Sequence, residues 1–193
     1  RSQKIDKDYV KRSVKIEGSG NIDDALAMGK GVILLSAHIG NWELGAFVTS
    51  IIGYPINAVV LTHKNKRIND FFTRQRLMGN MKPIEMGASL KSCYRALGNN
   101  ELVALLGDRD FTKNGLFVDF FGKKAMMPKG PATLSYRLGS PIVPIFLVRE
   151  PDNTFRYFVE KPIMCAPGLD EETAVKELTT RCSSVIEACV KKY

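Results

Sequence analysis

Four short runs of mostly apolar residues set the hydrophobic pattern of this chain. They cover residues 32–36, 55–61, 102–106 and 142–148, and each is followed by glycine, proline or polar residues. Runs this short and this apolar are typical of strands that are buried on both faces of a parallel sheet. Longer segments with helical spacing separate them. The pattern therefore predicts a single α/β domain with a mixed, mostly parallel sheet flanked by helices.

The weaker patterns predict the remaining elements. Alternation at residues 14–17 indicates an edge strand, and residues 82–85 and 155–161 are two further strands. Helices are expected at residues 21–28 with Asn21 as cap, from residue 42 with Asn41 as cap, and across 64–76, 89–97 and 170–192. The last carries acidic residues at its start, lysines at its end and an apolar stripe for the core. Residues 1–13 form a polar, basic lead-in.

The composition limits the possible partners. At 193 residues with a formal net charge of +8, the chain suits acidic partners such as anionic lipid, an acidic protein or nucleic acid. The basic residues are not interleaved with aromatic residues that stack on bases, which argues against nucleic acid. Four cysteines without a CxxC pair and two histidines argue against a zinc site and for a reducing environment. No apolar run is long enough to span a membrane.

The stretch that ends the strand at residues 32–36 carries the strongest chemical signal. His38 follows the strand, where open α/β sheets place their ligands, and Glu43 falls in the first turn of the next helix. We expect the turn to bring Glu43 onto one imidazole nitrogen, which would leave the other nitrogen as a base for a hydroxyl. That chemistry needs no metal or cofactor. The alternative is a structural histidine, with Glu43 only favouring the helix dipole.

Three other segments carry candidate residues. Asp108 and Arg109 follow the strand at residues 102–106, either as a loop that faces a site or as a salt-bridged turn. Gly130 precedes Pro131 at a predicted helix start, where free amides suit an anion. The helix at residues 64–76 has a cationic face, which for most of its lysines is solvated surface. We expect His63 to be structural or exposed.

Four motifs in order along residues 14–190 resemble the bacterial lipid A biosynthesis (lauroyl/myristoyl) acyltransferases, within the lysophospholipid/glycerolipid acyltransferase superfamily. The motifs are His38 to Glu43, Phe120-Phe121-Gly122, the turn at residues 128–132 and the segment at residues 139–144. The resemblance implies a glycerolipid-acyltransferase-like fold with His38 and Glu43 as catalytic residues. It also implies a substrate-binding set. This set comprises Asn41, Arg74 (near the family's arginine before a glycine, here Gly79), Asp108, Arg109 and Gly130.

The same resemblance implies transfer of a fatty acyl chain from acyl carrier protein or acyl-CoA to a hydroxyl of a lipid A-type glycolipid. The expected location is an anionic membrane surface, the cytoplasmic face of the bacterial inner membrane. The family's membrane anchor and carboxyl-terminal tail are expected to lie outside residues 1–193. Other acceptors stay open, namely a phosphatidylinositol mannoside, an amino-acid lipid or a lysophospholipid. A non-catalytic lipid-binding module and a thioester hydrolase are the alternatives from other classes.

Overall fold

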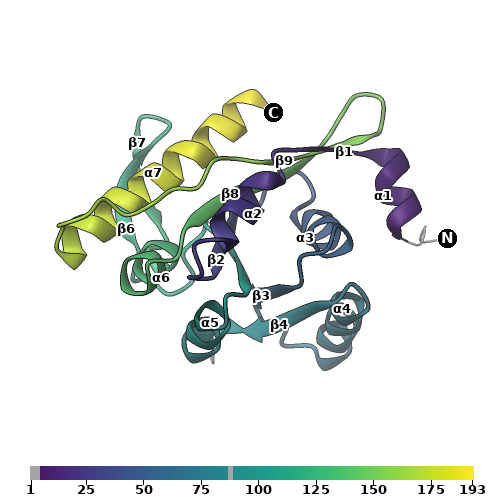
Figure 1. Ribbon diagram of the computed structural model, residues 1–193, viewed down its shortest axis with the longest axis horizontal. Coiled ribbons are helices and arrows are strands. Elements are labelled where there is room, and N and C mark those ends of the chain that lie inside the picture. The colour runs from purple at the N-terminus through teal and green to yellow at the C-terminus, as the bar shows by residue number, and fades with distance from the viewer. Residues whose placement is uncertain (1–4, 87–88) are drawn as a thin grey trace.

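A seven-stranded sheet forms the centre of the computed structural model, which describes residues 5–86 and 89–193 (Figure 1). The strands of the sheet are β1 (Val14–Glu17), β2 (Val32–Ser36), β3 (Ile56–Val60), β4 (Met81–Glu85), β5 (Leu102–Leu106), β8 (Ile142–Arg149) and β9 (Phe155–Val159). Strands β6 (Leu116–Phe120) and β7 (Lys123–Met127) form a separate hairpin. The helices are α1 (Lys7–Ser13), α2 (Gly20–Leu26), α3 (Trp42–Ile51), α4 (Lys66–Met78), α5 (Ser89–Gly98), α6 (Gly130–Leu138) and α7 (Glu171–Lys192).

The sheet is mixed and mostly parallel, which confirms the fold class predicted from the hydrophobic runs. Its strand order is β1-β9-β8-β2-β5-β3-β4. Every neighbouring pair is parallel except β8 and β9, which pair antiparallel. Strand β1 lies at one edge, as the alternation at residues 14–17 predicted. The sheet places the carboxyl ends of β2, β5 and β3 side by side, because these three parallel strands are direct neighbours.

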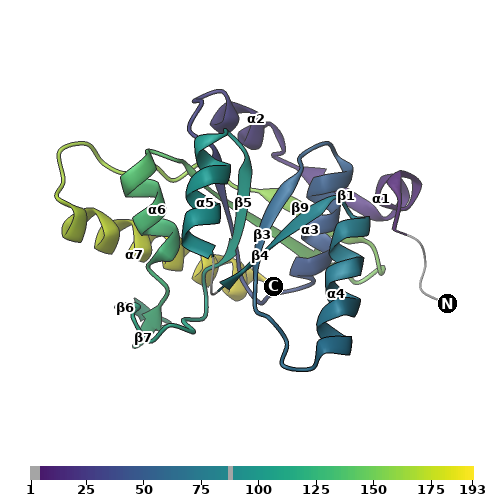
Figure 2. The ribbon, with the colours of Figure 1, turned by 90° about the horizontal axis from the view of Figure 1, so that it is seen from below.

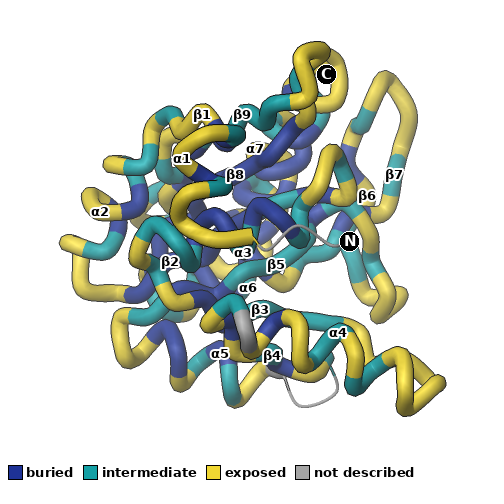
Figure 3. The backbone as a smooth tube through the Cα atoms, turned by 90° about the vertical axis from the view of Figure 1, so that its right-hand side faces the viewer, coloured by how far each residue is buried: buried dark blue, intermediate teal, exposed yellow. Residues whose placement is uncertain are grey.

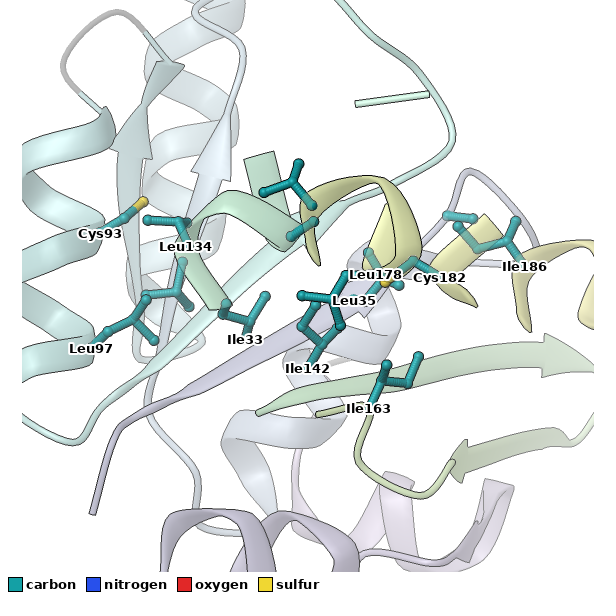
Figure 4. Packing of buried hydrophobic residues seen from close by; sticks show 14 of the residues in the cluster. Ile33, Leu35, Cys93, Leu97, Leu134, Ile142, Ile163, Leu178, Cys182 and Ile186 are labelled. Carbon is teal, nitrogen blue, oxygen red and sulfur yellow. The ribbon is translucent and has the colours of Figure 1, made fainter. Parts of the chain in front are cut away.

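Helices cover both faces of the sheet, and β2 shows why its first four residues are all apolar. Val32 and Leu34 pack on the side of α2 and α3, whereas Ile33 and Leu35 pack on the side of α5, α6 and α7. Figure 4 shows the second of these clusters, in which Ile33 and Leu35 meet side chains from the surrounding helices. All four residues are fully buried. A strand buried on both faces needs a continuous apolar run.

Three local features differ from the sequence-based expectation. Residues 7–13 of the expected lead-in form α1, which Asp6 caps by accepting from the amide of Tyr9; residues 1–4 lie outside the described residues. Helix α2 begins at Gly20, and the Asn21 side chain donates to Val159 O instead of capping. The hairpin β6–β7 was not predicted, because its exposed face carries apolar residues and hides the alternation of a two-stranded ribbon.

Two elements project from the edge of the sheet where β2, β3 and β5 end. Figure 2 shows the hairpin β6–β7 and the beginning of α4 at this same lower edge of the molecule. Figure 3 shows both again on one side, with much of α4 and the tip of the hairpin coloured as exposed, while β3 and β5 between them are coloured buried and intermediate. Within the described ranges, no helix has the length and apolar character that crossing a bilayer requires.

Candidate active site

His38 and Asp108 meet at the carboxyl edge of the sheet, each two residues after the end of its strand, β2 for His38 and β5 for Asp108. The imidazole Nδ1 lies 3.0 Å from Oδ1 and 3.2 Å from Oδ2 of Asp108. The backbone N–H of His38 also donates to Asp108 Oδ2, at 3.1 Å. The carboxylate thus holds both the backbone and the ring of His38. The neighbouring strands bring these two residues together across 70 positions of sequence.

The contact with Asp108 decides which imidazole nitrogen is free. An ionised carboxylate only accepts hydrogen bonds, so Nδ1 carries the proton and Nε2 of the neutral ring keeps its lone pair. The side chain of His38 is 37% exposed, and no described residue forms a hydrogen bond with Nε2. The ring edge packs against Trp42, with the ring centres 5.9 Å apart. The geometry is that of a base oriented by a carboxylate and open to a reactant.

Glu43 binds Arg76 instead of His38, which corrects the pairing predicted from the sequence. Glu43 Oε1 lies 2.8 Å from Nε of Arg76, and Arg76 is only 6% exposed. Asn41 caps α3, as predicted, by accepting from the amide of Leu44. Glu43 stands two residues after that cap, and its carboxylate is turned towards α4. Glu43 lies five residues after His38 in sequence, but in the fold the carboxylate that contacts the imidazole belongs to Asp108.

Aromatic rings hold Arg76 in place. Its guanidinium carbon lies 5.6 Å from the centre of the Phe72 ring, one turn earlier on α4. The ring of His63 also stacks on Phe72, with the two ring centres 5.1 Å apart. His63 is exposed, as expected, and its place in this stack is structural. A buried guanidinium is stable here because it has a carboxylate partner and an aromatic neighbour.

The end of α4 sets the position of Arg76 relative to α3. A Cβ atom on Gly79 would lie 2.1 Å from a ring carbon of Phe47, so the absence of a side chain lets α3 and α4 approach. Arg76 precedes this glycine by three residues and faces Glu43. Arg74, the residue chosen from the sequence, is exposed on the same helix. Sequence reasoning missed Arg76, although the glycine after it was the available signal.

The loop after Asp108 is organised by Asp110. Its carboxylate accepts from the amide and hydroxyl of Thr112 and from the amide of Gly115. Burial acts to raise the pKa of Asp110, but these hydrogen bonds outweigh it and hold the pKa below its usual value. Arg109 is exposed and lies over the ring of Phe111, 5.1 Å from its centre. The segment is therefore a hydrogen-bonded loop beside the site, in which Arg109 is free to meet an anion.

Asn41 and Gly130, the remaining predicted residues, lie at helix starts. The side-chain oxygen of Asn41 accepts from the backbone N–H of Leu44, and the backbone N–H of Asn41 donates to Leu147 O at 3.1 Å. Gly40 before it takes φ of +60°, and a Cβ there would lie 2.1 Å from Leu147 O. Gly130 opens α6, with Pro131 next to it, and a Cβ at Gly130 would meet nothing. Both helix starts are shaped as predicted, and substrate binding by these two residues stays a prediction.

An apolar pocket adjoins these groups on the face of the sheet that α3 covers. It encloses about 600 Å³, counting the part open to solvent, and Trp42, Glu43 and Arg76 line it together with Ser36. Its other walls come from β2, β3, β5 and β8, with small residues such as Gly45 and Ala58 leaving the space open. In the described part of the chain, no three histidine, cysteine or acidic side chains come together to hold a metal ion. The oriented base therefore contacts Trp42, a residue in the wall of this mostly apolar pocket.

Comparison with known proteins identifies the family. The model of the family described as bacterial lipid A biosynthesis acyltransferase matches residues 1–193. A phosphatidylinositol mannoside acyltransferase of Mycobacterium tuberculosis is 33% identical over 134 residues, which cover 67% of this chain and 42% of that protein. The lipid A biosynthesis lauroyltransferase of Escherichia coli is 27% identical over 184 residues, which cover 94% of this chain and 58% of that protein.

A solved structure shares the fold. The crystal structure of the 1-acyl-sn-glycerophosphate acyltransferase of Thermotoga maritima matches with a TM-score of 0.55 at 14% identity, over 94% of this chain and 73% of that one. The chain therefore spans about half the length of the sequence relatives and most of the structural one. The family match runs along the whole of the sequence and agrees with the motifs found in it. This chain belongs to the bacterial lipid A biosynthesis acyltransferase family.

Proposed function

We propose that this protein transfers a fatty acyl chain from a thioester to a hydroxyl group of a lipid acceptor. The observation that carries the proposal is the hydrogen bond between His38 and Asp108, which leaves Nε2 without a hydrogen-bond partner among the described residues. The imidazole contacts Trp42, which lines an apolar pocket. A base with a free lone pair suits removal of a hydroxyl proton. An apolar pocket of this kind suits a fatty acyl chain. The relatives named above, which are acyltransferases by name, support the same class of reaction.

The reaction follows from this arrangement. Nε2 of His38 takes the proton of the acceptor hydroxyl as its oxygen attacks the thioester carbonyl. The carbon–sulfur bond then breaks, and the imidazolium returns the proton to the departing thiolate. Asp108 keeps Nδ1 protonated throughout and stabilises the positive charge on the ring. No serine or cysteine of the protein is needed as a nucleophile, because the acceptor supplies the oxygen.

In this proposal the other candidate residues bind charged groups or stabilise charge. Glu43 holds Arg76 at the wall of the pocket and adds negative charge near the imidazolium. Arg109, Arg74 and the free amides at Gly130 are candidates for binding phosphate groups or the developing oxyanion, together with Asn41 at the start of α3. Arg76 is better placed than Arg74, since it lines the pocket whereas Arg74 is exposed.

The family match favours a lipid A-type glycolipid as acceptor, with acyl carrier protein as donor and acyl-CoA as the alternative donor. We place the reaction at an anionic membrane surface, on the cytoplasmic face of the bacterial inner membrane. A second acceptor has specific support, because the relative with 33% identity is a phosphatidylinositol mannoside acyltransferase. Both acceptors present hydroxyls on an anionic lipid, so the same site chemistry serves either.

Transfer can be tested directly with purified protein. We expect acyl groups to pass from acyl carrier protein to a lipid A precursor, with loss of the thioester and a mass increase of the lipid by one acyl group. Parallel reactions use acyl-CoA as donor and phosphatidylinositol mannoside or lysophospholipid as acceptor. Mass spectrometry of lipids from cells that lack and then regain the full-length gene identifies the natural acceptor. Release of free fatty acid with every acceptor present would instead indicate a thioester hydrolase.

Replacing Arg76 with lysine is expected to lower the turnover number by about 10²-fold, the cost of a misplacement of about 1 Å at a reacting centre. Lysine keeps the charge but loses the planar group that binds Glu43 and lies on Phe72. The matched change Arg74→Lys, on the exposed face of the same helix, should have the smaller effect. Turnover is measured at saturating donor, with the melting temperature as control. A larger loss for Arg74→Lys would assign the substrate contact to Arg74.

A further inference from the structure

Exposed apolar side chains gather on two elements that flank the candidate active site. The first group is on α4, where Ile68 and Phe71 point to solvent, Phe71 with 57% of its surface exposed. The second group is on the hairpin β6–β7, where Phe117 is 64% exposed and Phe121 and Met126 are also exposed. Single exposed apolar residues are common on protein surfaces, but groups of large ones mark a binding surface.

The group on α4 is mixed with positive charge. At 100° per residue, Ile68, Phe71, Arg67 and Arg74 fall within one arc of the helix, and the opposite side carries the buried Arg76. Lys64 and Lys66, at the beginning of the helix, are exposed as well. An amphipathic helix with aromatic and basic residues together on its outer face is typical of helices that lie in a membrane interface.

The hairpin presents a similar outer face. Val118 is buried on the inner side, while its neighbour Phe117 points outwards and pairs across the ribbon with Met126. Phe121 stands at the tip, where its amide donates to Glu187 of α7 and its ring lies 5.5 Å from Lys191 Nζ. Lys123 and Lys124 are exposed at the same tip, Lys124 paired with Asp119. The hydrogen bond and the ring contact join the tip to α7, while Phe117 and Met126 further along the ribbon are exposed.

The placement of the two groups relates them to the site. Helix α4 lies on the face of the sheet that α3 covers, and the hairpin lies on the face that α7 covers (Figure 1). Both extend past the edge where β2 and β5 end, and His38 and Asp108 follow those two strands (Figure 2). The open imidazole therefore lies on an edge that has an apolar and basic projection on either side.

We propose that this edge docks onto an anionic phospholipid membrane, with the outer face of α4 and the exposed face of the hairpin β6–β7 entering the interface on either side of His38. The docking edge is defined by its apolar residues Ile68, Phe71, Phe117, Phe121 and Met126 and its basic residues Lys66, Arg67 and Lys123. This inference rests on the proposed function, because docking would let a lipid acceptor reach His38 directly from the membrane.

The observations favour a membrane over an acidic protein as the occupant. An acidic carrier protein requires basic residues, but it does not require two aromatic projections on opposite sides of a site. A membrane uses both, because the aromatic side chains enter the apolar region while the lysines and arginines meet lipid phosphates. The net charge of +8 is complementary to such a surface.

Vesicle flotation with the 193-residue chain tests the proposal without requiring catalysis. The probes are vesicles of phosphatidylcholine with phosphatidylglycerol, and vesicles of phosphatidylcholine alone. We expect Ile68→Gln with Phe117→Thr to weaken binding to the anionic vesicles by about 100-fold or more, since each fully buried apolar side chain contributes about 1.5–3 kcal/mol. Lys66→Gln with Arg67→Gln should weaken it by roughly 25-fold, from about 1 kcal/mol for each charge. Raising salt should mimic the second pair.

The matched control is Met28→Gln with Lys30→Glu. Both residues are exposed and precede the amino end of β2, at the opposite edge of the sheet. Binding should be unchanged in this control. A second measurement keeps the aromatic character of the hairpin: Phe117→Trp should give a blue shift of tryptophan emission on anionic vesicles, and Met28→Trp should not.

Each outcome of these experiments supports or overturns the docking proposal. Wild-type binding by both docking-edge variants, or an equal loss in the control, overturns the proposal, as does an unshifted emission of Phe117→Trp on vesicles that bind the protein. Unchanged vesicle binding with lost transfer from acyl carrier protein would assign the edge to that acidic donor and would also overturn it. Transfer in detergent micelles should persist in the docking-edge variants. If the wild type binds vesicles but transfers no acyl group, the proposed function fails while the docking edge stands.

Discussion

Acyl transfer is expected to fall to background when His38 is replaced by alanine. The change removes the group that takes the proton from the acceptor hydroxyl, and general-base catalysis is worth about 10²–10⁴-fold. The fold should remain, because the side chain is 37% exposed and its ring and hydrogen-bond contacts are with Trp42 and Asp108. A change of stability within about 0.5 kcal/mol is typical of such a surface position. Turnover with acyl thioester and lipid acceptor, and a denaturant melt, measure the two quantities.

His63→Ala is the matched control for this experiment. His63 is the other histidine of the chain, and it stacks on Phe72 away from Asp108. It should keep most of the activity. Transfer at near the wild-type rate by His38→Ala would remove His38 as the base, and with it the mechanism proposed here.

Asparagine at position 108 is expected to lower the turnover number by about 10⁴-fold, the loss seen in the serine protease triad when the orienting carboxylate becomes an amide. The side-chain amide of asparagine can donate to Nδ1, which would move the imidazole proton to Nε2 and block the lone pair that acts as base. The negative charge that stabilises the imidazolium is lost as well. The effect should fall on turnover more than on the Michaelis constant, because ground-state binding does not use Asp108.

Glu43→Gln provides the comparison that separates the two carboxylates. This variant keeps the contact of His38 with Asp108 and loses the charge that binds Arg76. We expect it to lower turnover by less than Asp108→Asn does. The opposite order would mean that Glu43 orients His38 during the reaction, as the spacing of the two residues in sequence suggested. Asp108→Glu, which keeps the charge, should recover part of the activity.

Much of the fold followed from local patterns in the sequence. The run at residues 32–36 and the three like it became central strands, because a strand covered on both faces is mostly apolar. Asn41 capped α3 as its position indicated, since a cap depends on residues within one helical turn, and the helix expected at residues 170–192 became α7. The hairpin β6–β7 was missed because docking of one face on α7 left aromatic residues on the other, which masks the two-residue period.

The candidate site, like the fold, was predictable from the sequence only where it depends on local patterns. The sequence by itself determined that a histidine follows a buried strand at the edge where α/β sheets bind ligands, and that the chain carries the motifs of its family. Only the tertiary structure decided the partners. Parallel pairing of β2 with β5 in register brought Asp108 to His38, and the contact of Gly79 with Phe47 set α4 so that Arg76 reached Glu43. Both depend on contacts between residues distant in sequence, which no local spacing encodes.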